Sequence, residues 1–158
     1  MKKGLVFFDI DYVLFNTRHF KKSKLKDYEN YQETLSALKN LSEFITLGIF
    51  SKGKYDWQTA KLKNTGIANF FDKQNVHIFS NKNTNIKKVL DNYKDSKIFL
   101  IDDKLRVLYL VRKKSDSVFG VWLKRGPYAE NQKPIPDFKP DAEVENLSDA
   151  VKIIRSKL

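Results

Sequence analysis

The chain contains three short, mainly apolar segments that each stop at polar, mostly acidic residues, and this pattern limits the fold more than any other feature. Residues 5–8 form the first segment, residues 45–50 the second and residues 97–101 the third. Short apolar runs of this kind are typical of strands buried on both faces of a parallel sheet. The polar residues at the three ends are Asp9 and Asp11, Ser51, and Asp102 and Asp103.

Helical and strand-like segments alternate along the chain. Residues 31–44 carry apolar side chains at helical spacing, and residues 56–64 form a second predicted helix that ends at Gly66. Residues 107–112 favour a helix, although they also fit a strand. The remaining predicted helices are residues 83–93, with Thr84 or Asn85 as N-cap, and residues 147–158, with Ser148 as N-cap. The remaining predicted strands are residues 76–79 and 118–123, with residues 142–145 as a short final candidate.

This alternation predicts an α/β fold. Strands separated by helices form a parallel sheet with helices on both faces, so we expect a three-layer, Rossmann-like fold with about five central strands. The length suffices for one core, and we predict a single domain, residues 1–158. Residues 12–30 are expected to form a loop, and residues 126–141, which hold all four prolines, an extended loop.

Composition excludes several kinds of site. The chain has no cysteine, which rules out disulfides, thiolate metal sites and cysteine nucleophiles. His19 and His77 lack zinc-like spacing to other ligands, so we expect them to be structural. No apolar stretch approaches the roughly 20 residues of a membrane span, and we expect a soluble, cytoplasmic monomer. The net charge of +11 favours polyanionic partners, although the lysines are spread along the whole chain.

The polar strand ends are expected to lie close together, because the carboxyl ends of parallel strands meet at one edge of the sheet. Four acids gathered there would repel one another unless a cation compensates their charge. A ligand set made of oxygen atoms suits Mg²⁺, which also binds phosphate. The sequence therefore predicts a magnesium-assisted phosphate site at this edge.

Three motifs resemble those of the haloacid dehalogenase-like (HAD) superfamily of hydrolases. Residues 8–17, Phe-Asp-Ile-Asp-Tyr-Val-Leu-Phe-Asn-Thr, are similar to its first motif, in which two acids separated by one residue follow a buried strand. Ser51 is similar to the second motif, residues 100–103 to the fourth, and residues 140–147 to the end of many members. The resemblance implies a phosphatase without a sizeable cap domain, because the segments on either side of Ser51 leave no room for one.

The resemblance also implies roles for the motif residues. Asp9 is the expected nucleophile, which forms an aspartyl-phosphate, and Asp11 is the expected general acid and base. Dehalogenases of the superfamily lack an acid at the position of Asp11, so its presence favours a phosphatase. Ser51 and Lys52 are expected to bind the phosphoryl group. The expected ligands of Mg²⁺ are Asp9, the carbonyl of Asp11, Asp102 and Asp103, with Asp103 nearer to the metal.

The lysine of the third motif has two candidates. Lys82 follows a predicted strand and precedes a predicted helix, which matches common members of the superfamily, and we favour it. Lys87 lies closer to Asp102 along the chain, as in the phosphatases that act on the carboxy-terminal domain of RNA polymerase. One of the two lysines is expected to be essential.

The aromatic residues fall into two groups. Trp57 and Trp122 are expected in the core, where large apolar side chains usually lie. Tyr12 and Phe15 follow the nucleophile directly, where superfamily members carry a mobile flap, and we regard them, together with Phe20, as candidates for substrate contact.

The combined prediction is a magnesium-dependent phosphomonoester hydrolase. Its substrate is either a small phosphomonoester or a phosphorylated macromolecule, such as the end of a polynucleotide, because a site without a cap is open. The alternative is a module of the same fold that binds nucleic acid through its basic surface without catalysis. Turnover of a phosphomonoester separates the two, since the module would bind without releasing phosphate.

Overall fold

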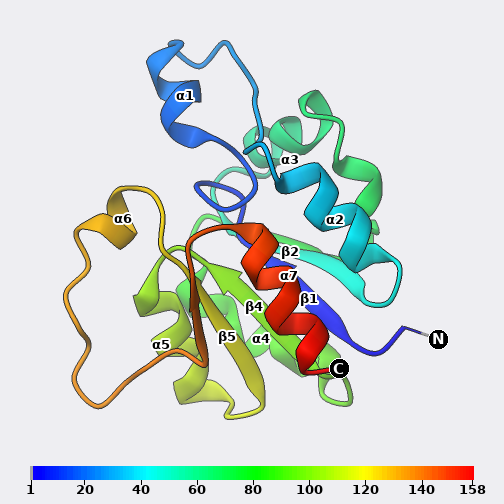
Figure 1. Ribbon diagram of the computed structural model, residues 1–158, viewed down its shortest axis with the longest axis vertical. Helices are drawn as coiled ribbons and strands as arrows, with labels where there is room; N and C mark the ends of the chain where they lie inside the picture. The colour runs from blue at the N-terminus through cyan, green and yellow to red at the C-terminus, as the bar shows by residue number, and fades with distance from the viewer. Residues whose placement is uncertain (1) are drawn as a thin grey trace.

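Residues 2–158 are described by a computed structural model, and in this range six parallel strands form one sheet in the order β3-β2-β1-β4-β5-β6 (Figure 1). The prediction of an α/β fold with a central parallel sheet is confirmed. The sheet has one strand more than the expected five, because the short final segment pairs with β5. The strands are β1 Leu5–Phe8, β2 Thr46–Lys52, β3 Val76–Phe79, β4 Ile98–Asp102, β5 Val118–Leu123 and β6 Ala142–Val144.

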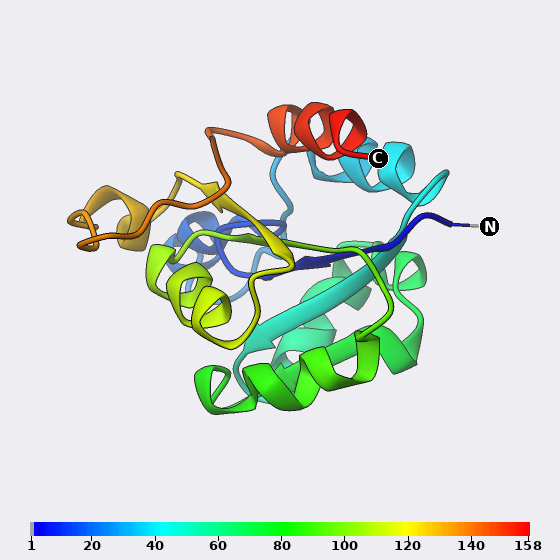
Figure 2. The same cartoon turned by 90° about the horizontal axis from the view of Figure 1, so that it is seen from below.

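Helices cover both faces of the sheet. Helices α2 and α7 lie on one face, and α4 and α5 lie on the other (Figure 2). Between β1 and β2, the described chain contains α1 and α2 and no sizeable cap domain. The helices are α1 Thr17–Lys22, α2 Thr34–Ser42, α3 Tyr55–Asn64, α4 Ile86–Leu90, α5 Leu105–Lys114, α6 Pro127–Glu130 and α7 Leu147–Ser156.

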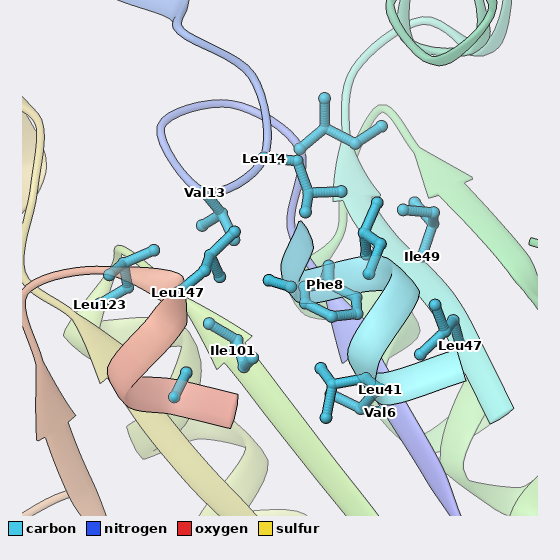
Figure 3. Packing of buried hydrophobic residues seen from close by; sticks show 14 of the residues in the cluster. Val6, Phe8, Val13, Leu14, Leu41, Leu47, Ile49, Ile101, Leu123 and Leu147 are labelled. Atoms are coloured by element: carbon cyan, nitrogen blue, oxygen red, sulfur yellow. The ribbon is translucent and has the colours of Figure 1, made fainter. Parts of the chain in front are cut away.

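The position of β1 between two helical layers explains why its sequence is apolar at every position. Successive side chains of a strand point to opposite faces, and both faces of β1 are covered. Val6 and Phe8 pack in the core beneath α2 and α7 (Figure 3). Leu5 and Phe7 pack in the second core, beneath α4 and α5. Full burial of a side chain such as Phe8 contributes about 2–3 kcal/mol, so this central strand is a strong anchor for the residues that follow it.

Both expected loops contain a short helix. Residues 12–30 include α1, whose N-cap Asn16 accepts a hydrogen bond from the backbone N–H of His19 at 3.1 Å. Residues 126–141 include α6, which begins with Pro127. Proline is well suited to the first turn of a helix, because its missing N–H has no intrahelical partner there.

Three predicted helices are refined by the structure. Residues 107–112 are confirmed as helical within α5. The helix expected over residues 83–93 is a short α4 flanked by 3₁₀ turns. Ser148 does not cap α7, because Asn146 precedes the helix with extended backbone and its Oδ1 accepts from the N–H of Asp149 at 2.9 Å.

No helix within residues 2–158 combines the length and the apolar character needed to cross a membrane.

Candidate active site

Three buried carboxylates meet at the carboxyl edge of the sheet, at the ends of β1 and β4. Phe8 and Ile101 are paired neighbours in these strands, so Asp9 follows one strand directly beside the end of the other. One ligand oxygen from each of Asp9, Asp102 and Asp103 lies within 4.8 Å of the other two. The convergence expected from a parallel sheet is therefore observed, and it gathers negative charge where little water enters.

Lys82 partly compensates this charge. It follows β3, its side chain is buried, and its Nζ lies 2.5 Å from Asp102 Oδ2 and 3.6 Å from Asp9 Oδ1. Burial opposes the charge of the lysine, but the carboxylates of Asp102 and Asp9 outweigh burial and raise the pKa of Lys82. Lys87 is exposed on α4 and pairs with Asp91 at 2.8 Å. Of the two candidate lysines, Lys82 is therefore the one that lies at the carboxylate cluster.

Asp103 has the properties of a metal ligand. Within residues 2–158, neither of its buried carboxylate oxygens has a hydrogen-bond partner. Burial, together with the charges of Asp102 and Asp9, raises the pKa of Asp103 to about 10. The oxygens of Asp102, by contrast, accept from Lys82 and from the backbone N–H of Lys104. A divalent cation would satisfy the free oxygens and favour their charged form, so the donor set fits Mg²⁺.

The carboxylate of Asp9 is held by the backbone of the next residue. Burial raises the pKa of Asp9 to about 6, against the lowering effect of Lys82 and with a further increase from Asp102. The N–H of Ile10 donates to Asp9 Oδ1 at 2.9 Å. Both the Ile10 and the Lys82 contacts involve Oδ1, so Oδ2 takes part in neither of them.

Asp11 is held by three side chains that sequence reasoning missed. Its Oδ1 accepts from Lys61 Nζ at 2.8 Å and from Thr17 Oγ1 at 2.9 Å, and its Oδ2 accepts from Gln58 Nε2 at 3.1 Å. Gln58 and Lys61 stand three positions apart on α3, a spacing that places both on one side of a helix. That spacing is present in the sequence, but nothing in it indicates that this side of α3 faces the first motif.

Ser51 lies at the end of β2 and is fully buried. Gln58 Nε2 lies 3.0 Å from Ser51 Oγ, so the same amide connects Ser51 with Asp11. The backbone between Ser51 and Gln58 turns sharply at Gly53, where an added Cβ would lie 2.8 Å from Gln58 Cγ. Lys52 lies beside Asp9 in the wall of the cavity described below.

The loop after Asp9 is fixed by an arginine that is distant from it in the sequence. Arg125, just after β5, donates to the backbone oxygens of Tyr12 and Val13. Glu33 holds Arg125 through a 2.7 Å contact. Tyr12 itself has a left-handed backbone, with φ of 63°, and its strained conformation is thus tied to two further segments of the chain.

The structure corrects two of the aromatic predictions. Phe15 is 1% exposed and packs against Phe20 in the core, so the prediction that Phe15 contacts substrate is wrong. Trp57 is 62% exposed, so its expected place in the core is also wrong, whereas Trp122 is buried as expected. Tyr12 lines the cavity beside Asp9.

His19 and His77 lie outside the carboxylate cluster. His77 Nε2 is 2.7 Å from the hydroxyl of Tyr93. His19 Nε2 is 3.2 Å from Glu29 Oε2 at the surface. These contacts agree with the expectation that both histidines are structural.

Two cavities open onto Asp9 and share Lys52 and Lys104 in their walls. The first, of about 230 Å³, extends from Asp9 toward Lys82. The second, of about 340 Å³, extends from Asp9 toward Asp11 and the surface. Together they provide one space for a group bound at the carboxylates and another for the remainder of a substrate.

The chain matches no family model and no curated protein, but it is similar in structure to several solved proteins. A haloacid dehalogenase-like hydrolase from Burkholderia xenovorans is 19% identical with a TM-score of 0.80, and the match covers 99% of this chain and 98% of that one. The HAD-hydrolase YfnB from Bacillus subtilis, bound to magnesium, is 11% identical with a TM-score of 0.76 over 98% and 99% of the two chains. An L-2-haloacid dehalogenase from Xanthobacter autotrophicus is 12% identical with a TM-score of 0.74 over the full length of both.

These likenesses define the class of fold. The chain has the haloacid dehalogenase-like fold, as its first motif implied. The solved proteins with this fold include a dehalogenase as well as a magnesium-bound hydrolase, so the chemistry has to be inferred from the side chains of this site.

Proposed function

We propose that the protein is a magnesium-dependent phosphomonoester hydrolase in which Asp9 is the nucleophile. The observation that supports this proposal most strongly is the buried group of Asp9, Asp102 and Asp103 with Lys82 in contact. Three carboxylates and one ammonium leave a net negative charge in a buried place, and a divalent cation with a bound phosphate is the chemistry that such a place suits.

The reaction has two steps. In the first, Asp9 Oδ2 attacks phosphorus, the bond from phosphorus to the leaving oxygen breaks, and Asp11, which begins this step protonated, gives that oxygen its proton. In the second, Asp11 takes a proton from water, whose oxygen attacks phosphorus, and the bond between Asp9 and phosphorus breaks. Phosphate is released, and both aspartates return to their initial state.

Other side chains bind the group that is transferred. Lys82 and Ser51 are assigned to the phosphoryl oxygens, because Lys82 Nζ lies 3.6 Å from Asp9 Oδ1 and Ser51 lies near the end of β2, the strand that pairs with β1. Asp9, Asp103, Asp102 and the carbonyl of Asp11 are assigned as the residues that hold Mg²⁺. When bound, the ion supplies neutralising charge for the phosphoryl oxygens.

Asp11 favours phosphoryl transfer over dehalogenation. A leaving alkoxide needs a proton, whereas a leaving halide does not, so a second carboxylate beside the nucleophile is useful for the first reaction. Asp11 lines the same cavity as Asp9. Its three side-chain partners hold it in place before substrate arrives.

The test is phosphate release from a set of phosphomonoesters, glycerol phosphate and a mononucleotide among them, in the presence of Mg²⁺ or of EDTA. Release that requires Mg²⁺ and disappears in Asp9→Asn is expected. Asp116→Asn is the matched control, because Asp116 is an exposed carboxylate outside the cluster. If no phosphomonoester is hydrolysed, or if Asp9→Asn keeps full activity, the proposal is wrong and a binding role becomes the better explanation.

A further inference from the structure

The outer cavity has large apolar side chains at its mouth. Trp57 is 62% exposed, Tyr128 50% and Leu25 51%, and all three line the cavity that also contains Asp9 and Asp11. Single exposed apolar residues need no explanation, but several that surround one cavity mark a binding surface. None of these three side chains belongs to either hydrophobic core, so the fold does not require them to be buried.

The aromatic residues flank the nucleophile from both sides. Trp57 lies on α3, which follows β2, and Tyr128 lies on α6, after β5 (Figure 1). In the sheet, β1 with its terminal Asp9 lies between β2 and β5. A ligand whose phosphate reaches Asp9 can therefore contact either aromatic residue as it leaves the cavity.

Lysines accompany these rings. The cavity wall contains Lys21, Lys52, Lys61 and Lys104. Lys104 Nζ is 4.2 Å from the centre of the Tyr128 ring, and Lys54 Nζ is 5.1 Å from the centre of the Trp57 ring. Lys61 is paired with Asp11, so the other lysines of the cavity wall are the ones available to an anion. Aromatic platforms next to positive groups are the combination that binds single-stranded nucleic acid, because bases stack on the rings and the backbone follows the charges.

We propose that the substrate of this site is the phosphorylated end of a single-stranded polynucleotide. The terminal phosphate lies at Asp9, a base close to the end stacks on Trp57, and backbone phosphates contact the lysines at the mouth. This proposal rests on the proposed phosphatase function, since it assigns a substrate to the same site. A single strand is favoured over a duplex, because bases inside a duplex are covered on both faces by their neighbours.

The net charge of +11 agrees with this assignment. A small monoester gains little from charge beyond the site that binds its phosphate, whereas each backbone phosphate of a polynucleotide that is neutralised adds affinity through release of counterions. The wall of the outer cavity contributes four lysines and three acids, and the acids are Asp9, Asp11 and Asp103 of the catalytic cluster. The lysines are therefore in excess toward the entrance.

The experiment compares kcat/KM for four substrates with Mg²⁺ present. These are single-stranded oligonucleotides phosphorylated at the 5′ or the 3′ end, a mononucleotide, and glycerol phosphate, which has no base. We expect at least one oligonucleotide to exceed the mononucleotide and glycerol phosphate by about tenfold or more, and its kcat/KM to fall linearly with salt on a double logarithmic scale.

Variants of α3 test the stacking contact. Trp57→Ala is expected to lower the ratio of kcat/KM for the oligonucleotide to that for glycerol phosphate by about tenfold, and Trp57→Phe is expected to restore most of it. Tyr55→Ala is the matched control, because Tyr55 is 49% exposed on the same helix but outside the cavity wall. All three substitutions alter exposed side chains, so the fold is expected to be retained.

The outcomes separate the two proposals. Hydrolysis of glycerol phosphate without any preference for an oligonucleotide overturns the polynucleotide assignment and leaves the phosphatase intact. The same conclusion follows if the mononucleotide equals the oligonucleotides, or if Trp57→Ala lowers turnover of all substrates equally. Absence of phosphate release from every substrate overturns both proposals.

Discussion

Lys82 Nζ lies 2.5 Å from Asp102 Oδ2, and both side chains are buried. Lys82 follows β3 at one edge of the sheet, whereas Asp102 ends β4, so the contact reaches across the ends of β2 and β1. The ion pair therefore joins the ends of β3 and β4 at the edge of the sheet where Asp9 lies. Removal of one partner leaves a buried charge without compensation, which is more costly than the loss of a surface pair.

Lys82→Met is expected to reduce phosphate release by a hundredfold or more and to lower the free energy of unfolding by about 3 kcal/mol. Phosphate release and urea denaturation are the two measurements. Lys87→Met is the control, since Lys87 is an exposed lysine on the helix that follows, and it should match the wild type in both. Loss of activity in Lys87→Met with normal activity in Lys82→Met would reverse our assignment of the third-motif lysine.

Mg²⁺ is expected to stabilise the protein against heat. A ligand that binds only the folded state contributes about 2.7 kcal/mol at one hundred times its dissociation constant, and the unpartnered oxygens of Asp103 provide the site. The increase in Tm with Mg²⁺ should disappear in Asp103→Asn and remain in Asp116→Asn. An equal increase in both variants would place the ion elsewhere. This readout is independent of catalysis.

Lys61→Gln is expected to lower kcat/KM for a phosphomonoester by about tenfold, because Asp11 loses the ammonium that holds Oδ1 and a small displacement of a reacting group is costly. Lys63→Gln is the matched control, since Lys63 is exposed on the same helix and its substitution removes the same positive charge. Steady-state kinetics of the two variants gives the comparison. Equal effects would mean that the overall charge of α3 matters and the contact with Asp11 does not.

Glu33→Gln is expected to destabilise the protein at neutral pH by about 1–2 kcal/mol. Burial alone would raise the pKa of Glu33, but the N–H of Leu147 and the side chain of Arg125 lower it below its ordinary value of 4.5. A carboxyl group with a lowered pKa in the folded state contributes stability above its unfolded pKa and loses it as pH falls through the folded value.

The difference in unfolding free energy between wild type and Glu33→Gln should therefore be constant above pH 4.5 and shrink below it. Urea denaturation over a pH series measures this difference, with Glu43→Gln, an exposed site, as control. A difference that does not change as the pH falls below 4.5 would contradict the assigned contacts.

Gly126→Ala is expected to be more destabilising than Gly66→Ala. Both glycines have positive φ, +86° and +77°, so both substitutions strain the backbone. An added Cβ at Gly126 would lie 2.7 Å from Tyr12 Cδ1, whereas nothing lies within 4 Å of one at Gly66. The strain common to both is about 1–3 kcal/mol, and thermal denaturation should show an additional loss for Gly126→Ala. Equal losses would mean that the Tyr12 ring moves away at little cost.

The identity of the site was accessible from the sequence because its main elements are local. An apolar run that ends in an acid indicates both a buried strand and the position of a carboxylate. Asp9, Asp102 and Asp103 could therefore be expected at one sheet edge before the sheet was known. The fold class followed in the same way from the alternation of strands and helices.

Several contacts could not be foreseen, because they join segments distant along the chain. The sequence left Lys82 and Lys87 as alternatives. The structure distinguishes them, because the side chain of Lys82 is buried against Asp102 whereas that of Lys87 is exposed. It contained no indication that Gln58 and Lys61 face Asp11. The orientation of a helix around its own axis depends on packing against neighbours, and α3 is too polar to reveal its buried side by periodicity.

By itself, the sequence determined the strands, the parallel sheet and the acids that end its central strands, since all of these follow from the pattern of apolar and polar residues over a few positions. The tertiary structure decided that Lys82 lies among those acids, that Phe15 is enclosed in the core and that Trp57 stands exposed at the mouth of the cavity. The physical reason is that burial is a property of the neighbours that packing brings to a side chain, and those neighbours come from distant parts of the chain.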